Sequence, residues 1–490
     1  MKSSSRSTSL GRMMAYSTGE CANSLIMNGL FGFAMLYYTK ALGLSPSLAG
    51  LAMSVSVFWE AITDPVMGYV SDRTRSRFGL RHPWMILGGA LMAVTFYFVW
   101  AVPQAIIGHS QATFWYLVTM NLILRTGLTM FFIPYMALGF ELVTDYQQRA
   151  TLQGLRQAFN MAANFAGPAM AWSIFFQNQH TTEGTDIAAN YVHMGGAFSV
   201  ATAIFVAFVI VATWSQSQDT RNLPPPKGGG EIAGFFSEMK SILADPYPRW
   251  VFVFIFILAV GMVLVSSLQM YVYVDFMRFS PEQKSIAHGG TMAGMGLGAL
   301  LSSWLVKRFE KKGAVLIGGA LSIICNLTLA TLFLTGFVPH RTLCLVGSVE
   351  ITLPLLLFVV FHSAYWFGNG IMLPISNAMM ADVSEINRIK TGVNKDGGYA
   401  AVFSLALRLA ISLGLIVSGY VLERVGFQTG ADKVQSADVV WRIGAATFLA
   451  GSLICAAALL AIRRYGVDEV LLRKLRLGAE EIWQPATVKP

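Results

Sequence analysis

The stretch WEAITDPVMGYVSDRTRSRFGLRHPW, from Trp59 to Trp84, joins an apolar run to a short and strongly basic loop. Within the apolar run lie two acids, Glu60 and Asp64, which are four residues apart and therefore share one face of a helix. Carboxylates in the middle of a membrane are costly unless they are paired, hydrated or protonated, and they usually mark a functional site. The stretch therefore predicts a membrane-spanning helix that carries an acidic site and ends at a basic loop.

The composition of the whole chain also indicates a membrane protein. Of its 490 residues, 54% are hydrophobic and only 12% are charged, whereas soluble domains have about twice that share of charged residues. The net charge of +9 raises the alternative of a nucleic-acid-binding protein. The Lys and Arg residues, however, lie in short clusters between apolar runs, which is typical of membrane orientation. We therefore expect an integral membrane protein without a nucleic-acid partner.

Twelve apolar runs are long enough to cross a bilayer, for which about 20 residues are needed. In chain order, these spans 1 to 12 centre on Leu30, Val57, Met92, Ile123, Ala166, Val206, Leu258, Leu297, Ser322, Tyr365, Leu413 and Ala450. A polar stretch with a proline run and a glycine run separates them into two sets of six, as a linker does. The sequence predicts an all-α membrane protein with an N-terminal half (1–214), a linker (215–249), a C-terminal half (250–462) and a tail (463–490).

The distribution of basic residues predicts how the chain is oriented. If the N-terminus is inside, the cytoplasmic segments hold 25 Lys and Arg residues and the opposite segments hold 7. Basic loops favour the cytoplasmic side. The first apolar run is too long for the core of a signal peptide, so we interpret it as an uncleaved span. We expect both termini in the cytoplasm and, from the short loops, a bacterial inner membrane.

The basic loop and three further blocks carry a resemblance to a known family. The pattern DPxxGxxxDRTRSRxGxRxPW begins at Asp64, PYMALGFEL begins at Pro134, MADV begins at Met380, and Arg408 lies inside span 11. Together they resemble the glycoside–pentoside–hexuronide:cation symporter family of the major facilitator superfamily, whose best-known member is the bacterial melibiose permease. The resemblance implies the major facilitator fold of twelve transmembrane helices and a secondary active transporter.

The resemblance also implies a cation-coupling site on spans 2, 4 and 11. Glu60 and Asp64 align with two acids of the family's cation site, and Thr129 aligns with a threonine of span 4. Arg408 aligns with a nearby basic residue of span 11. Where the family has a further acid on span 4, this chain has Phe132, so one acidic ligand is missing.

Span 4 offers a replacement for that missing acid. Arg125, Thr129, Phe132 and Met136 are spaced by 4, 3 and 4 residues and therefore form one stripe of the helix. If the stripe faces span 2, the guanidinium of Arg125 can neutralise one carboxylate without sodium. We expect coupling that has moved towards protons or has been lost. The alternative is that Arg125 forms a purely structural bridge.

The candidates for substrate binding follow partly from the resemblance and partly from helical spacing. Arg156 aligns with a sugar-contacting arginine of span 5, whereas Ser24 and Met136 stand where the family has a sugar-binding aspartate and a tryptophan. These replacements argue against melibiose as the substrate. The complete predicted set is Glu20, Asn23, Ser24, Phe132, Met136, Arg156, Asn160 and Asn369. Glu20 has the alternative of capping a helix or facing solvent, and Asn369 that of bridging two helices.

The DRTRSR loop predicts a second kind of site, a cytoplasmic gate. An aspartate precedes the three arginines, so Asp–Arg pairs between neighbouring loops can hold that side of the protein closed. The predicted gate consists of Asp72, Arg73, Arg75, Arg77, Glu141, Arg149 and Asp382. Such a gate would control conformational switching and not the choice of substrate. The alternative is that the arginines serve only membrane orientation.

The sequence therefore favours a transporter that moves a small polar solute, such as a sugar, glycoside or sugar acid, together with a cation. We expect the cation to be H+ rather than Na+, no other cofactor, no metal site, and a monomer surrounded by membrane lipid. The alternative is a lysolipid or amphipathic-solute carrier of the same fold, because Phe132 and Met136 make span 4 more apolar. A membrane enzyme is not favoured, since no catalytic motif with its proper context occurs.

Overall fold

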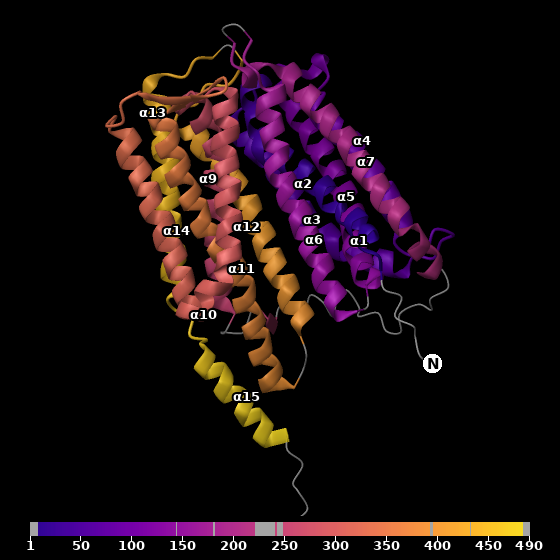
Figure 1. Ribbon diagram of the computed structural model, residues 1–490. Coiled ribbons are helices and arrows are strands. Elements are labelled where there is room, and N and C mark those ends of the chain that lie inside the picture. The colour runs from indigo at the N-terminus through magenta and orange to yellow at the C-terminus, as the bar shows by residue number, and fades with distance from the viewer. Residues whose placement is uncertain are drawn as a thin grey trace, which may run out of the picture.

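The molecule consists almost entirely of long helices that pack into two neighbouring halves (Figure 1). The computed structural model describes residues 8–143, 145–179, 182–220, 241–242, 248–392, 395–431 and 433–483. Most of the predicted linker therefore lies outside the described residues, and the boundaries of the predicted segments stay a prediction.

Spans 1 to 6 of the prediction form the N-terminal half. Span 1 consists of α1 (Leu10–Ser17), α2 (Gly19–Gly29) and two π-helical segments, η1 (Leu30–Ala34) and η2 (Tyr37–Ala41). The other five spans are α3 (Pro46–Arg73), α4 (His82–Trp100), α5 (Ser110–Leu142), α6 (Tyr146–Met170) with η4 (Ala171–Phe175), and α7 (Ala188–Thr220). Two short 3-10 turns, η3 (Gln104–Ile106) and η5 (Gly184–Asp186), lie in the connections.

Spans 7 to 12 form the C-terminal half. They comprise α9 (Arg249–Tyr271) with η6 (Val272–Phe276), α10 (Pro281–Leu334), α11 (Leu353–Thr391), α12 (Asp396–Arg424), and α13 (Ala437–Ala445) with η7 (Ala446–Ala450) and α14 (Gly451–Ile462). The 54-residue α10 contains spans 8 and 9, because the chain leaves the helical conformation at Glu310, where φ is 58°. An antiparallel hairpin of β1 (Thr342–Val346) and β2 (Val349–Thr352) precedes α11, and α15 (Glu469–Trp483) follows span 12.

Polarity is distributed unevenly among the twelve spans. Eight of the described helices are long and apolar enough to cross a membrane, and α10 among them supplies two crossings. The three spans that fall short of this level of hydropathy are spans 1, 2 and 5, which carry Glu20, Glu60 and Arg156 respectively. All three of these less apolar spans carry predicted site residues, whereas spans 4, 10 and 11, which carry the others, do reach that level.

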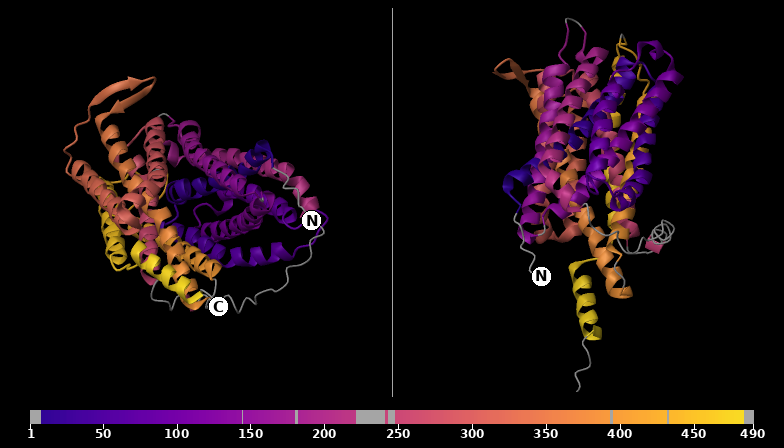
Figure 2. Two further views of the ribbon diagram at one scale, coloured as in Figure 1. Left: turned by 60° about the horizontal axis from the view of Figure 1, so that its bottom comes forward. Right: turned by 90° about the vertical axis from the view of Figure 1, so that its right-hand side faces the viewer.

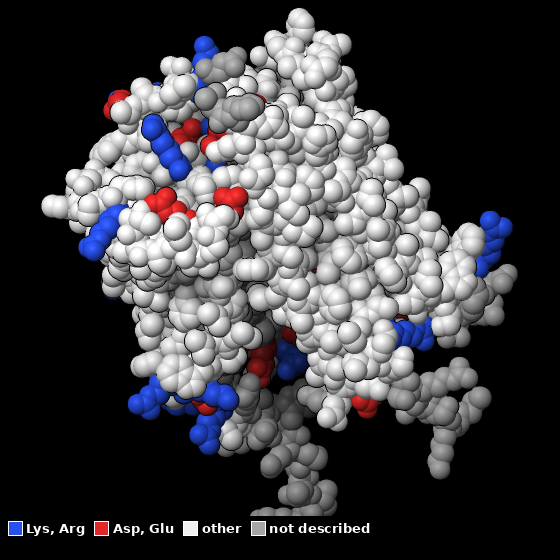
Figure 3. Space-filling model, turned by 45° about the horizontal axis from the view of Figure 1, so that its top comes forward, with Lys and Arg blue, Asp and Glu red and all other residues white. Residues whose placement is uncertain are grey.

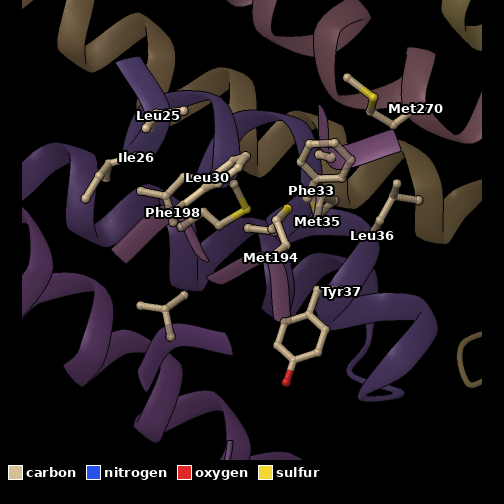
Figure 4. Packing of buried hydrophobic residues seen from close by; sticks show 14 of the residues in the cluster. Leu25, Ile26, Leu30, Phe33, Met35, Leu36, Tyr37, Met194, Phe198 and Met270 are labelled. Atoms are coloured by element: carbon tan, nitrogen blue, oxygen red, sulfur yellow. The ribbon is translucent and has the colours of Figure 1, made fainter. Parts of the chain in front are cut away.

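Span 1 is buried in the centre of the packing. Phe33 of η1 stacks on Phe176, with ring centroids 5.0 Å apart, and it also contacts Trp172. Figure 4 shows Met270 of the C-terminal half lying close to Phe33 and Met35 of span 1. One continuous hydrophobic cluster thus includes residues of both halves.

Small residues allow the backbones of α10 and α11 to approach closely. Gly290, Gly294 and Gly298 are spaced by four residues and lie on one face of α10. A Cβ atom at Gly294 or Gly298 would overlap a backbone carbonyl of α11. Membrane helices commonly associate through small residues that let their backbones approach closely. Burial of apolar side chains gives little gain in a membrane, because lipid tails are equally apolar, so helix association depends on close van der Waals packing.

The two ends of the bundle differ in how the halves meet. We call the end with the β1–β2 hairpin the closed end and the end with α15 the open end (Figures 1 and 2). Between described residues, the hydrogen bonds and ion pairs that join the halves lie from the closed end to the level of Arg408. Figure 3 shows a hollow near the boundary of the halves, with acidic and basic side chains in it. Among the described residues, the polar contacts between the halves are therefore concentrated on the side of the closed end.

Replacing Gly298 by Ala tests the packing of α10 on α11. We expect the variant to unfold at a lower temperature, since overpacking of a tight contact costs about 1–3 kcal/mol. The matched control is Gly154→Ala on α6, where an added Cβ meets no atom within 4 Å. In the control, the lower backbone entropy of Ala should stabilise the helix by about 0.5–1 kcal/mol. Equal unfolding midpoints for the two variants in detergent would contradict the proposed close packing.

Candidate functional site

The acids of span 2 lie at the centre of a charged cluster that includes both halves. Arg125 of α5 donates a hydrogen bond to Oε1 of Glu60, with an N–O distance of 3.0 Å. Arg408 of α12 pairs with both Glu60 and Asp64. Thr129 of α5 donates to Oδ1 of Asp64 at 2.7 Å. Arg125 and Thr129 of the span 4 stripe thus face span 2, whereas Met136 contacts Arg156 of α6.

The cluster is balanced in charge and only partly shielded from solvent, since the side chains of Arg408 and Asp64 are 26% and 18% exposed. It contains two carboxylates and two guanidinium groups, and Glu60 and Arg125 are 4% and 3% exposed. Burial of an unpaired charge costs several kcal/mol, so each of these groups depends on its partners. With both carboxylates paired, no formal negative charge is left over for a metal cation. The cluster also links the two halves, because Arg408 belongs to the C-terminal half and its partners Glu60 and Asp64 belong to the N-terminal half.

A second buried ion pair lies within the N-terminal half. Arg156 of α6 donates through Nε to Oε1 of Glu20 on α2 at 2.8 Å, and both side chains are 8% exposed. Arg156 also donates to Gln153 at 3.1 Å and contacts the sulfur of Met136. Glu20 is therefore neither a helix cap nor exposed to solvent.

A chain of hydrogen bonds continues from this ion pair along α2 and α6. Asn160 donates to the hydroxyl of Ser24 at 2.9 Å. Asn164 donates to Asn160 at 2.9 Å, and Asn28 donates to Asn164 at 2.7 Å. All four side chains are polar, and Asn28, Asn160 and Asn164 are partly exposed. The arrangement offers both donors and acceptors to a hydroxyl-rich solute.

The remaining predicted binding residues occupy different surroundings. Phe132 is half-buried, and its ring lies 5.8 Å from that of Tyr135. Asn23 is half-buried on α2. Asn369 is 1% exposed inside the C-terminal half, where it donates to the carbonyl of Tyr365 at 2.9 Å and to Ser322 at 3.4 Å. The structure does not bring Asn369 to the cluster around Arg156; it connects α11 to α10.

Two of the predicted gate residues, Asp72 and Glu141, meet at Arg81, an arginine of the quoted motif that lies outside the predicted gate. Arg81 pairs with Asp72 and with Glu141, the latter with an N–O distance of 3.0 Å. Arg149 donates to the carbonyl of Val143 at 3.0 Å. Arg81 thus connects the loop after span 2 with the end of span 4, within one half.

The other gate residues also interact with their own half. The guanidinium of Arg73 lies 3.6 Å from the ring centre of Tyr69, and Arg77 stacks on the neighbouring Phe78. Arg75 donates to the backbone carbonyls of Asp72 and Thr74. Asp382 of α11 accepts a hydrogen bond from Lys311 at 2.6 Å, in the C-terminal half. In this conformation, these pairs stabilise the open end of each half separately.

Two buried lysines at the closed end join the halves, and sequence reasoning missed both. Lys40 lies 2.9 Å from Asp275 of the C-terminal half and 3.3 Å from Asp186. Lys284 of α10 pairs with Glu183 of the N-terminal half and is fully buried. Burial raises the pKa of Asp186, and the adjacent Lys40 opposes that shift. The sequence offers little signal for either, since each is a single lysine at the edge of an apolar run, among the seven basic residues of the opposite segments.

The sequence pattern of one protein family, described as MFS/sugar transport protein, matches residues 15–469 of the chain. The chain belongs to this family. The match includes both halves, so the predicted major facilitator fold is confirmed, as is the resemblance to cation symporters of this superfamily. The protein is a membrane transporter of small molecules and not an enzyme.

Relatives with this fold carry different kinds of solute. The inner membrane symporter YicJ of Escherichia coli (strain K12) is 23% identical over 98% of this chain and 97% of its own length. The sodium-dependent lysophosphatidylcholine symporter 1 of Homo sapiens is 23% identical over 90% of this chain and 80% of its own length. The crystal structure of a D-xylose-proton symporter superposes with a TM-score of 0.62 at 13% identity, covering 93% of this chain and 97% of the other.

Neutralising Glu20 and Arg156 separately and together tests how strongly this pair depends on both partners. Each single variant, Glu20→Gln or Arg156→Gln, should lose on the order of 3 kcal/mol of stability, because one buried charge is left without its partner. The double variant should recover much of that loss. The measurement is the thermal unfolding midpoint of the purified variants. Strictly additive losses would show that the two side chains are not coupled.

Replacing Lys284 by Met tests the closed end. Loss of the buried pair with Glu183 should disfavour the closed end by on the order of 3 kcal/mol. With spin labels at exposed Ala150 of α6 and Ala381 of α11, we expect a larger population with a short distance across the open end. Arg442→Met is the matched control, because its pair with Asp438 is exposed and lies within one half, and such pairs contribute little. An unchanged distance distribution for Lys284→Met would contradict a role of this pair in conformational balance.

Proposed function

We propose that this transporter moves a small polar solute, such as a sugar, glycoside or sugar acid, in symport with a proton. The observation that carries the proposal is the cluster of Glu60, Asp64, Arg125 and Arg408, which connects the halves through buried charge. When a carboxylate takes up a proton, its attraction to a guanidinium falls, and the link between the halves weakens. Proton binding and movement of the halves are then coupled through the same side chains.

The pairing of the carboxylates favours a proton over sodium. A sodium ion at this site would need carboxylate oxygens that are not already held by guanidinium groups. Arg125 and Arg408 occupy both Glu60 and Asp64, while Phe132 offers no oxygen at the remaining span 4 position. A proton needs only one oxygen lone pair, so it competes for the site without a coordination shell.

The binding of the solute is assigned to the N-terminal cluster of Glu20, Ser24, Asn160 and Arg156. These residues form two hydrogen-bonded pairs, an anion with a cation in Glu20–Arg156 and a hydroxyl with an amide in Ser24–Asn160. Sugars and sugar acids present hydroxyl and carboxylate groups that match such a set, and the family's description as sugar transport proteins agrees. Asn23, Phe132 and Met136 would form the less polar margin of this site.

We infer that the open end faces the cytoplasm of a bacterial cell, with both termini on that side of the inner membrane. The excess of Lys and Arg on that side, 25 against 7, supports this orientation, and the relative YicJ is named an inner membrane symporter. The conformation would then be inward-facing. In the opposite conformation, Asp72, Glu141 and Arg149 would approach Asp382 and form the gate. The transporter would work as a monomer.

A lysolipid or other amphipathic solute is the second candidate. Phe132 replaces an acid of the family's cation site and Met136 replaces a tryptophan of its sugar-binding pattern, and both make span 4 more apolar. A human relative is named as a lysophosphatidylcholine symporter. In this case Arg156 and Glu20 would bind the zwitterionic headgroup, and the tail would lie along Phe132.

The proposed function is tested by ligand-dependent unfolding together with uptake into proteoliposomes. Purified protein is mixed with sugars, sugar acids or lysolipids, with and without sodium, at two pH values. A ligand present at 100 times its Kd should stabilise the protein by about 2.7 kcal/mol. We expect stabilisation by a sugar-like solute and uptake driven by a pH gradient alone. Stabilisation only by lysolipids would favour the second candidate, and strict sodium dependence at constant pH would refute proton coupling.

Removing the guanidinium of Arg125 should restore sensitivity to sodium. In Arg125→Met, Oε1 of Glu60 loses its partner and the cluster carries one negative charge, so sodium should raise the unfolding temperature of this variant and not of the parent protein. Arg125→Lys is the control, because it keeps the charge and should stay insensitive to sodium. If sodium stabilises the parent and the Met variant equally, Arg125 does not decide the choice of ion.

A further inference from the structure

The hairpin at the closed end exposes an unusual amount of apolar surface. All five residues of β1 are exposed, and they include Leu343, Leu345 and Val346, of which Leu345 is 70% and Val346 63% exposed. Phe337, in the connection before the hairpin, is 76% exposed. Large exposed apolar patches usually mark a surface that contacts a partner or a membrane.

Both faces of the hairpin carry aliphatic side chains, and Glu350, which lies opposite Leu345, is the one charged residue of the two strands. This distribution restricts what can cover the hairpin. Cys344 lies opposite Ile351 and Val346 opposite Val349, so these four residues share one face. Leu345 points to the other face because successive side chains of a strand alternate. A protein partner docked on one face would leave aliphatic side chains of the other face in water. A surrounding apolar medium covers both.

The position of the hairpin is consistent with such a medium. It connects two membrane-spanning helices, beginning eight residues after the end of α10 at Leu334 and ending at the start of α11. Its base is fixed by hydrogen bonds from the backbone N–H of Leu353 to the carbonyl of Arg341 at 2.8 Å and from Gln283 to the carbonyl of Glu350 at 2.7 Å. In both views of Figure 2, the strands extend sideways beyond the outline of the helices. The hairpin therefore lies where the lipid that surrounds the bundle begins.

We propose that the β1–β2 hairpin inserts into the lipid at the membrane boundary and anchors the connection between spans 9 and 10. The depth is limited by the backbone, because a two-stranded hairpin has unpaired N–H and C=O groups along both edges. Such groups are too costly in the hydrocarbon centre but can be hydrated at headgroup level. The exposed His340 and Arg341 just before β1 would lie among the headgroups. This role is independent of the transported solute and of the coupling ion.

The chain contains its own reporter for this proposal. Cys344 is exposed, whereas the other three cysteines, Cys21, Cys325 and Cys455, are buried. A thiol-reactive, environment-sensitive fluorophore should therefore label Cys344 in the full-length protein without any added cysteine, and Cys344→Ser should abolish the labelling. The labelled transporter is then reconstituted into vesicles made of neutral and anionic phospholipids. Quenching by iodide in water is compared with quenching by nitroxides attached to the lipids.

Insertion predicts emission shifted to the blue on reconstitution and stronger quenching by a nitroxide near the headgroup than by iodide. Leu345→Ser combined with Val346→Ser should reverse the order of the two quenchers. Val434→Ser is the matched control, since Val434 is 86% exposed in another loop of the C-terminal half, and it should leave both signals unchanged. Dominant quenching by iodide in the parent would overturn the proposal. Disulfide-linked dimers through Cys344 on mild oxidation, without lipid quenching, would instead assign the hairpin to contact with a second copy.

Discussion

The pairing of Arg408 in one half with Glu60 and Asp64 in the other is the interaction on which the rest of the structure depends. A buried carboxylate such as Glu60 is tolerated only with partners, and here one of its partners comes from the opposite half. The halves cannot separate at this level without first changing the charge or the hydration of the cluster. The relative position of the halves therefore depends on the charge of the cluster. Coupling of ion binding to movement of the halves requires such a dependence.

The same constraint explains why polar and apolar spans are arranged as they are. Spans 1, 2 and 5 are too polar to be stable against lipid on all sides, and they pack against more apolar helices, namely α7, α12 and α10 respectively. Gly290, Gly294 and Gly298 form a stripe on α10 that allows α10 to pack closely against α11. Packing of the apolar spans thus stabilises the fold. This stabilisation offsets the cost of burying the hydrogen-bonding side chains of the polar spans between the halves.

The sequence was sufficient for features that depend on local periodicity. Twelve spans, the shared face of Glu60 and Asp64, and the span 4 stripe with Arg125 all follow from helical spacing. It was insufficient where partners come from distant parts of the chain. Lys40 and Asp275 are 235 residues apart, and nothing in either local pattern connects them. Asn369 lay on a plausible face, but tertiary packing turned it towards Ser322 inside the C-terminal half.

The turn at Glu310 has a consequence for how force passes through the C-terminal half. Spans 8 and 9 are joined by a single residue outside the helical conformation, with no loop to take up slack. The two helices therefore form one bent helical unit and not two helices joined by a flexible loop. A displacement of span 8 at its Lys284 end therefore reaches span 9 through the backbone at Glu310, without an intervening loop.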